Sequence, residues 1–129
     1  MKVIIVDDSQ TVCQALSKIV TQLGYEPIEA ANGAEALAKL RTHYRQVGLI
    51  ILDWNMPVMD GFTALGKIKA SDQFKHIPVL MATSDGVKED VIKALKAGAA
   101  SYLVKPFDKK KLADTIHELL STGTPTTKA

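Results

Sequence analysis

Three aspartates that follow two apolar runs are the residues of this sequence best suited to chemistry. Asp7 and Asp8 follow the apolar run 3–6, and Asp53 follows the apolar run 49–52. Carboxylate oxygens are ligands that Mg²⁺ prefers, usually together with water and phosphate oxygens. A carboxylate can also attack phosphorus and form an aspartyl-phosphate. If the three side chains meet, they predict a divalent-metal site that contains a nucleophile.

Two further apolar runs end in groups that could hold a phosphoryl group. Thr83 follows the run 79–82, and Lys105 follows the run 102–104. Attack by an anionic carboxylate on an anionic donor requires charge neutralisation, which a metal ion and an ammonium group supply. We therefore assign Asp53 as the nucleophile and phosphoacceptor. Lys105 is the predicted cation on one phosphoryl oxygen, and Thr83 the predicted hydroxyl donor to another.

The predicted metal is Mg²⁺, and Mn²⁺ is the expected substitute. Its direct ligands are expected to be Asp8 and Asp53, with Asp7 bound either directly or through water and the backbone carbonyl of Asn55 as a further ligand. Each residue alone has an ordinary structural interpretation, because an aspartate before a helix is commonly its N-cap and Thr83 could be a turn residue. The joint placement of the set favours the functional interpretation.

These side chains can meet only if several strands end at one edge of a sheet. Apolar runs and helical patterns alternate five times along the sequence. Such alternation predicts an α/β fold, a doubly wound parallel sheet with helices on both faces. We predict strands over 2–6, 25–30, 49–52, 79–82 and 102–104, and helices over 9–23, 34–44, 62–71, 88–97 and 109–120.

Local signals refine this arrangement. Pro27 cannot donate to a strand ladder, so the second strand is predicted at a sheet edge. This fits the strand order 2-1-3-4-5 of flavodoxin-like folds, in which ligands bind beyond the carboxyl ends of the strands; the order is taken from that fold class. Gly24 and Gly98 stand where helix C-caps are expected, and Asn32 where an N-cap is expected.

Composition limits the classes of function. The chain has 129 residues, 47% of them hydrophobic, which suits one domain; we place it over 1–121, with a flexible polar tail over 122–129 and no output domain. A net charge of +2 disfavours nucleic-acid binding. No apolar run approaches the ~20 residues of a membrane span. Without a secretory signal, and with Cys13 as the one cysteine, we expect a cytoplasmic protein.

The chemistry-bearing segments resemble the receiver domains of two-component response regulators. The matching segments, in the order and spacing of that family, are 6–9 (Val-Asp-Asp-Ser), 52–53 (Leu-Asp), 56–61 (Met-Pro-Val-Met-Asp-Gly), 83–84 (Thr-Ser) and 105–107 (Lys-Pro-Phe). The similarity spans about residues 1–121. The segment 53–57 and the expected lack of an output domain most resemble the stand-alone, CheY-like chemotaxis branch of the family.

The resemblance implies a phosphorylation-controlled switch. The donor would be a phosphohistidine on a sensor histidine kinase of the chemotaxis type, and the domain would catalyse only its own phosphorylation and dephosphorylation. Thr83 and Tyr102 would form a switch pair that alters the surface made by the fourth helix, fifth strand and fifth helix. The output partner would be a flagellar motor switch protein or another protein, and a phosphatase is a candidate partner.

The resemblance also assigns residues around the acceptor. Asn55 and Asp85 occupy the two positions that tune phosphate lifetime in this family. We further expect Gly61 to adopt a positive φ after the third-strand loop.

Other functions fit the sequence less well. A phosphate sink or shuttle in another phosphorelay would share the same site. A haloacid-dehalogenase-type phosphatase needs an Asp-x-Asp pair, whereas Asp7 and Asp8 are adjacent. A flavodoxin-like cofactor carrier needs a phosphate-binding loop after the first strand. Asp7 and Asp8 at that position would repel the phosphate of the cofactor. A receiver that binds partners without phosphorylation would not need the intact acidic set.

Overall fold

The computed structural model describes residues 1–54, 58–83, 88–104 and 108–122. Its strands are β1 (Lys2–Val6), β2 (Glu26–Ala30), β3 (Val47–Leu52), β4 (Val79–Thr83) and β5 (Ser101–Val104). Its helices are α1 (Gln10–Gln22), α2 (Gly33–His43), α3 (Gly61–Ala70), α4 (Lys88–Lys96) and α5 (Lys109–Thr122). The strands pair in parallel in the order β2-β1-β3-β4-β5, which confirms the predicted fold class and strand order.

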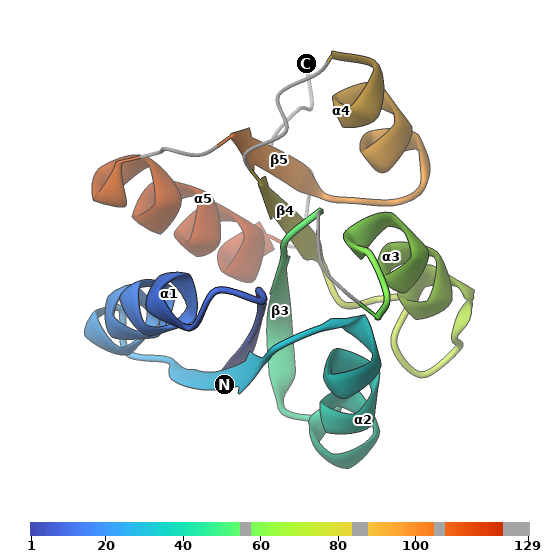
Figure 1. Ribbon diagram of the computed structural model, residues 1–129. Coiled ribbons are helices and arrows are strands. Elements are labelled where there is room, and N and C mark those ends of the chain that lie inside the picture. The colour runs from blue at the N-terminus through green and yellow to red at the C-terminus, as the bar shows by residue number, and fades with distance from the viewer. Residues whose placement is uncertain (55–57, 84–87, 105–107, 123–129) are drawn as a thin grey trace.

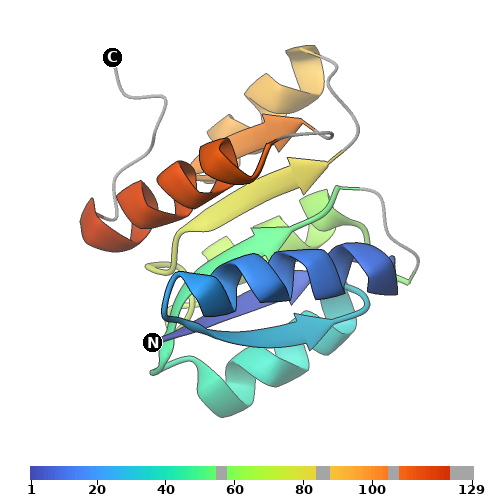
Figure 2. The same cartoon turned by 90° about the vertical axis from the view of Figure 1, so that its left-hand side faces the viewer.

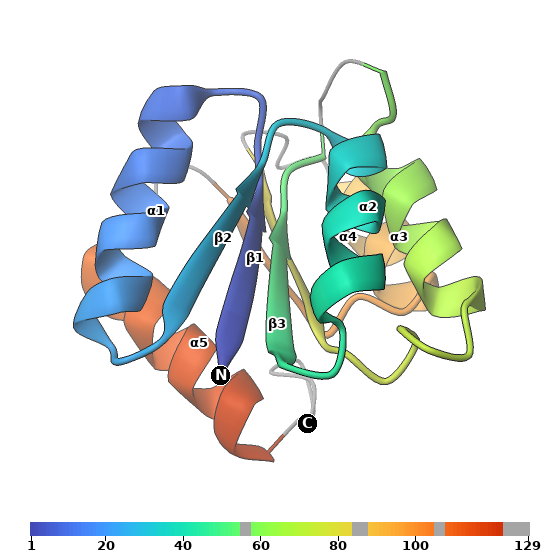
Figure 3. The same ribbon diagram turned by 90° about the horizontal axis from the view of Figure 1, so that it is seen from below.

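The molecule has three layers, with the sheet in the middle. Helices α1 and α5 cover one face, and α2, α3 and α4 cover the other (Figures 1 and 3). The core on the first face includes Leu16 of α1 and Ile116 of α5. The core on the second face includes Leu40 of α2, Leu65 of α3 and Ala94 of α4. Both faces of the sheet are therefore buried, as the alternation of strands and helices predicts.

The central strand β1 shows why its sequence is apolar without alternation. Successive side chains of a strand point to opposite faces. Val3 and Ile5 accordingly pack in the core under α1 and α5, whereas Ile4 and Val6 pack in the core under α2, α3 and α4. All four are buried, so every position of this strand needs an apolar residue.

The edge position of β2 agrees with its proline. Figure 2 shows β2 and β5 at the two ends of the sheet. Pro27 lies opposite Val3 of β1 and, like its neighbours in β2, is less buried than the central strands. A proline at the sheet edge removes no second ladder of hydrogen bonds, so the fold tolerates it there.

Most differences from the predicted element bounds concern one or two residues at the ends. Ser9 is the N-cap of α1, and its side chain accepts a hydrogen bond from the Val12 backbone N–H at 3.3 Å. Asn32 caps α2 in the same way and accepts from the Glu35 N–H at 2.9 Å, as predicted. The differences of two residues are at the end of α5, which reaches Thr122, and at the start of β3. Strand β3 begins at Val47, where its pairing with Lys2 involves a register shift.

Two of the three glycine predictions are confirmed, and one is wrong. Gly24 and Gly98 have φ of +94° and +113°, as expected of residues that follow helices. Gly61 does not adopt a positive φ, so that prediction is wrong. Among the described residues of this loop, Val58 has a positive φ, at +68°.

The predicted flexible tail over 122–129 lies outside the described residues, except for Thr122, which ends α5. Among the residues that the structure does describe, no helix combines the length and apolar character of a membrane span.

Candidate metal and phosphoacceptor site

The backbone places Asp7 and Asp53 side by side at the carboxyl edge of the sheet. Val6 of β1 lies opposite Leu52 of β3, and each aspartate is the next residue along its chain. The hydrogen bonding between β1 and β3 continues past the end of β3, because the Asp53 N–H donates to the Val6 carbonyl at 2.9 Å. On the other side of β1, the Asp7 N–H donates to the Ala30 carbonyl at 3.1 Å. The backbones of both candidate site residues are thus fixed by sheet hydrogen bonds.

Local hydrogen bonds orient the two buried carboxylates. Asp7 is 3% exposed, and its Oδ1 accepts from the Ser9 N–H at 2.9 Å. Asp53 is 7% exposed, and its Oδ1 accepts from the Trp54 N–H at 2.9 Å. Each bond uses an N–H of the loop that follows the strand, so the loop backbone itself sets the direction of each carboxylate.

Asp8 completes the cluster from the solvent side. It is exposed, and carboxylate oxygens of Asp7, Asp8 and Asp53 all lie within 4.8 Å of one another. Three like charges at this separation repel, and a hard divalent cation that binds oxygen removes the conflict. The donor set, composed wholly of carboxylates, fits Mg²⁺ or Mn²⁺ better than a softer metal. The geometry therefore supports the predicted metal ligands Asp7, Asp8 and Asp53.

A close backbone approach holds the loop after β3 against the acceptor. A Cβ built on Gly61 would lie 2.0 Å from the Asp53 carbonyl oxygen and 2.8 Å from the Trp54 Cα. The Gly61 N–H donates to the Trp54 carbonyl at 2.8 Å. Gly61 is therefore required for space, because the start of α3 crosses directly over the acceptor backbone.

An aromatic pair joins the residue after Asp53 to α3, and a lysine of α4 lies over that pair. The rings of Trp54 and Phe62 have centroids 5.4 Å apart, and the Lys93 Nζ of α4 lies 4.3 Å from the Phe62 ring centroid. Trp54 is partly buried and packs against the core under α2, α3 and α4. The sequence analysis missed the Phe62–Lys93 contact, because no local pattern relates two residues on different helices.

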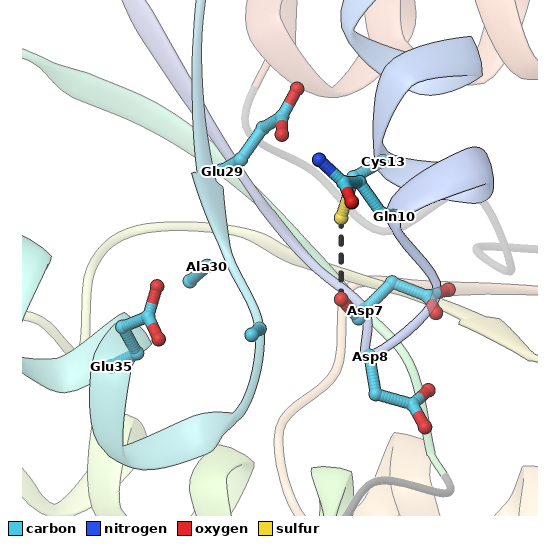
Figure 4. A pocket seen from close by; sticks show the side chains of 8 residues that line it. Asp7, Asp8, Gln10, Cys13, Glu29, Ala30 and Glu35 are labelled. Carbon is cyan, nitrogen blue, oxygen red and sulfur yellow. Dashed lines mark hydrogen bonds between the residues drawn. The ribbon is translucent and has the colours of Figure 1, made fainter.

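A pocket of about 390 Å³ opens beside the acidic cluster. Figure 4 shows Asp7 and Asp8 on the segment between β1 and α1, with Glu29 and Glu35 on β2 and α2. The Cys13 thiol donates to the Asp7 carbonyl at 3.2 Å, which gives this buried cysteine a structural role. Sequence reasoning did not place Glu29 and Glu35 near the site, since both belong to other elements.

Of the remaining residues predicted for the site, the structure describes only Thr83 and Tyr102. Thr83 ends β4 and lies opposite Val104 of β5, two residues beyond Tyr102. Tyr102 is partly buried and packs against the same core as Trp54. The predictions that fall on Asn55, Asp85 and Lys105 lie outside the described residues.

A sequence model of the response regulator receiver domain matches residues 3–117. The chain belongs to this family. The chemotaxis protein CheY1 of Helicobacter pylori strain J99 is 42% identical to this receiver domain over 124 residues, which cover 95% of the chain and 99% of that relative. The resemblance stated from the sequence is therefore confirmed, and so is its CheY-like chemotaxis branch.

Solved structures of CheY proteins share the fold of this receiver domain. The Vibrio cholerae chemotaxis protein CheY4 has a TM-score of 0.84 and 38% identity, covering 91% of this chain and 96% of that one. CheY in the CheX–CheY–BeF₃–Mg²⁺ complex of Borrelia burgdorferi has a TM-score of 0.87 and 36% identity, covering 92% of this chain and 88% of that one. That CheY-type structure contains Mg²⁺, the metal that the donor set here favours.

Magnesium should stabilise this receiver domain through the acidic cluster. A ligand that binds only the folded state at ten times its Kd adds about 1.4 kcal/mol, a rise in melting temperature of several degrees. In Asp8→Asn, which removes the exposed carboxylate of the cluster, we expect at least about a tenfold loss of Mg²⁺ affinity and most of this rise to disappear. Differential scanning fluorimetry with and without Mg²⁺ measures both effects.

The matched control for this substitution is Glu35→Gln, which removes the same charge from the wall of the same pocket but outside the cluster. Glu35→Gln should retain the response to Mg²⁺. An equal loss in both variants would show that general pocket charge, rather than ligation, governs the response.

Proposed function

We propose that this receiver domain is a phosphorylation-activated switch that accepts a phosphoryl group on Asp53 in a Mg²⁺-dependent reaction. The observation that carries the proposal is the meeting of three carboxylates within 4.8 Å at the carboxyl edge of β1 and β3. One of them, Asp53, is buried, fixed by the Trp54 N–H and central in the sheet. This is the arrangement that a positioned nucleophile beside a metal needs.

The transfer step makes one bond and breaks one. A carboxylate oxygen of Asp53 bonds to phosphorus while the P–N bond of a phosphohistidine breaks, and its electron pair returns to the imidazole nitrogen of the donor. Mg²⁺ held by Asp7, Asp8 and Asp53 would supply positive charge to the phosphoryl oxygens. Lys105 is proposed to bind one of these oxygens and Thr83 to donate a hydrogen bond to another. The domain thereby catalyses only its own phosphorylation and dephosphorylation.

The proposed output is a change in the surface made by α4, β5 and α5. Thr83 and Tyr102 act as the switch pair, and their positions on the neighbouring strands β4 and β5 support this role. The surface also exposes Ile92 of α4 and Val104 of β5, at 41% and 42%. Contacts formed only in the phosphorylated state shift a two-state equilibrium in proportion to their free energy.

The proposed partners follow from the CheY-type relatives. The phosphodonor is a sensor histidine kinase of the chemotaxis type, and the output partner is a flagellar motor switch protein or another protein that binds the α4–β5–α5 surface. A phosphatase is the third candidate partner. Asn55 and Asp85 are proposed to set the lifetime of the phosphoryl group by controlling the attacking water.

Intact mass spectrometry after mixing the protein with acetyl phosphate and Mg²⁺ tests the proposal. We expect a transient gain of one phosphoryl group that depends on Mg²⁺ and is blocked by a chelator. No gain with metal, or an equal gain without metal, would contradict the proposed reaction. The decay of the same signal in Asp85→Ala tests the lifetime role, which an unchanged rate would exclude.

A further inference from the structure

A second cavity, away from the acidic cluster, lies between α2 and α3. It has a volume of about 390 Å³ and is lined by Ala34, Leu37, Arg41, Met59 and Lys67. Figure 3 shows α2 and α3 side by side on the face of the sheet opposite α1 and α5. We call this cavity the α2–α3 groove. None of its lining residues has a role in the proposed phosphoryl transfer.

The floor of the α2–α3 groove is apolar and firmly packed. Leu37 and Met59 are partly buried and pack against the core under α2, α3 and α4. Met59 reaches across to α2, since a Cβ built on Gly33 would lie 2.9 Å from the Met59 Sδ. The groove therefore offers fixed apolar surface to a ligand, which lowers the entropic cost of binding there.

The two walls of the groove carry positive charge. Arg41 of α2 and Lys67 of α3 are both exposed, and none of the described residues that line the groove carries a carboxylate. Within the described part of the chain, neither side chain forms an ion pair or a hydrogen bond. An apolar floor between two available cations is complementary to an apolar stripe flanked by carboxylates.

A strained apolar residue, Val58, directly precedes the lining residue Met59 in the chain. Val58 is 83% exposed and has a φ of +68°. A β-branched residue in this region is a genuine outlier, because its side chain clashes with the backbone. Strain of this kind marks functional positions, and among the described residues neither core cluster includes Val58. Val58 is therefore available to a partner.

We propose that the α2–α3 groove, together with Val58 beside its lining residue Met59 in the chain, binds an acidic amphipathic helix of a partner protein. The apolar stripe of the helix lies on Leu37 and Met59, and its carboxylates pair with Arg41 and Lys67. A helix fits because an amphipathic helix lays its apolar face into a hydrophobic groove, and this groove is lined by residues of two helices. Two cations are too few for a nucleic-acid strand, which requires a larger basic surface. The site goes beyond the proposed phosphorylation switch and does not depend on it.

A defined peptide pair tests the charge complementarity. The probe is a helical peptide of about 18 residues, five turns, with a leucine stripe flanked by glutamates; its partner carries lysines in place of the glutamates. Fluorescence anisotropy should show the wild-type protein binding the acidic peptide about tenfold more tightly, with loss at high salt. Arg41→Glu with Lys67→Glu should reverse the preference, whereas Lys96→Glu with Lys111→Glu, on α4 and α5, should retain it. Equal affinity for both peptides, or loss of preference in the control pair, would overturn the proposal.

Val58→Asn separates docking from a structural role. Asparagine adopts positive φ more readily than valine, so the variant should melt at a higher temperature. It should nevertheless bind the acidic peptide about three- to tenfold more weakly, because a buried apolar contact is lost. Phosphorylation by acetyl phosphate should be unaffected in this variant. A failure of that reaction in the wild type would contradict the proposed phosphorylation switch and would leave the peptide site unaffected. Unchanged peptide affinity in Val58→Asn would refute the role of Val58.

Discussion

Replacing Asp53 by asparagine will abolish phosphoryl uptake from acetyl phosphate while the fold is retained. An amide is a poor nucleophile towards phosphorus, so the gain in intact mass seen for the wild type should fall below detection. The Trp54 N–H can still donate to the Oδ1 of an asparagine at the 2.9 Å position that Asp53 now occupies. The variant also carries one fewer like charge within the 4.8 Å cluster. We therefore expect a metal-free melting temperature no lower than that of the wild type.

The same variant should respond less to magnesium. Removal of one of three carboxylates from a divalent site lowers affinity by at least about tenfold, so the Mg²⁺-dependent rise in melting temperature should shrink. Asp60→Asn is the matched control. Asp60 also follows β3, but its carboxylate accepts from the Thr63 N–H as the N-cap of α3. Asp60→Asn should still be phosphorylated, and a phosphoryl gain in Asp53→Asn would assign the acceptor to another residue.

Gly61→Ala will cause the largest loss of stability among the single substitutions considered. Its Cβ would lie 2.0 Å from the Asp53 carbonyl oxygen, which is backbone and cannot rotate away. The start of α3 must then separate from the end of β3. We expect a loss of about 3 kcal/mol or more and a fall in melting temperature of roughly 10 °C or more. Denaturant unfolding followed by circular dichroism measures the free energy.

Gly66→Ala is the matched control within the same helix. A Cβ at Gly66 would meet nothing within 4 Å, and alanine favours helix over glycine by about 0.5–1 kcal/mol. This variant should therefore be slightly more stable than the wild type. Gly61→Ala should also bind Mg²⁺ more weakly, since the acceptor backbone moves. A stable Gly61→Ala variant with wild-type Mg²⁺ affinity would show that the close approach is not required.

Much of the fold could be predicted because its signals are local. The run Val3–Val6 is apolar at every position, which indicates burial on both faces, and its alternate residues do pack in two separate cores. Pro27 indicated an edge strand, and Asn32 indicated a helix start that the structure confirms. The flavodoxin-like fold class supplied the strand order, and the chemistry of carboxylate, hydroxyl and ammonium groups supplied the roles of Asp53, Thr83 and Lys105. The family resemblance added the switch pair and the two residues that tune phosphate lifetime.

The loop after β3 shows where local reasoning failed. Gly61 was expected to serve a positive φ, but the structure uses it for a close approach to the Asp53 carbonyl, and the positive φ falls on Val58. A glycine signals that a side chain is excluded without saying whether a torsion angle or a neighbouring atom excludes it. That neighbour comes from another element, so the sequence around the glycine does not reveal it.

The sequence alone determined which groups this receiver domain can use: three carboxylates at strand ends, a hydroxyl and a lysine, in an α/β alternation that brings strand ends together. Only the tertiary structure decided what surrounds them. The contact of Lys93 with Phe62, the α2–α3 groove between Arg41 and Lys67 and the crossing of Gly61 over Asp53 all join separate elements. Strand and helix periodicity depend on neighbours in the chain, whereas such contacts depend on how the helices pack on the sheet.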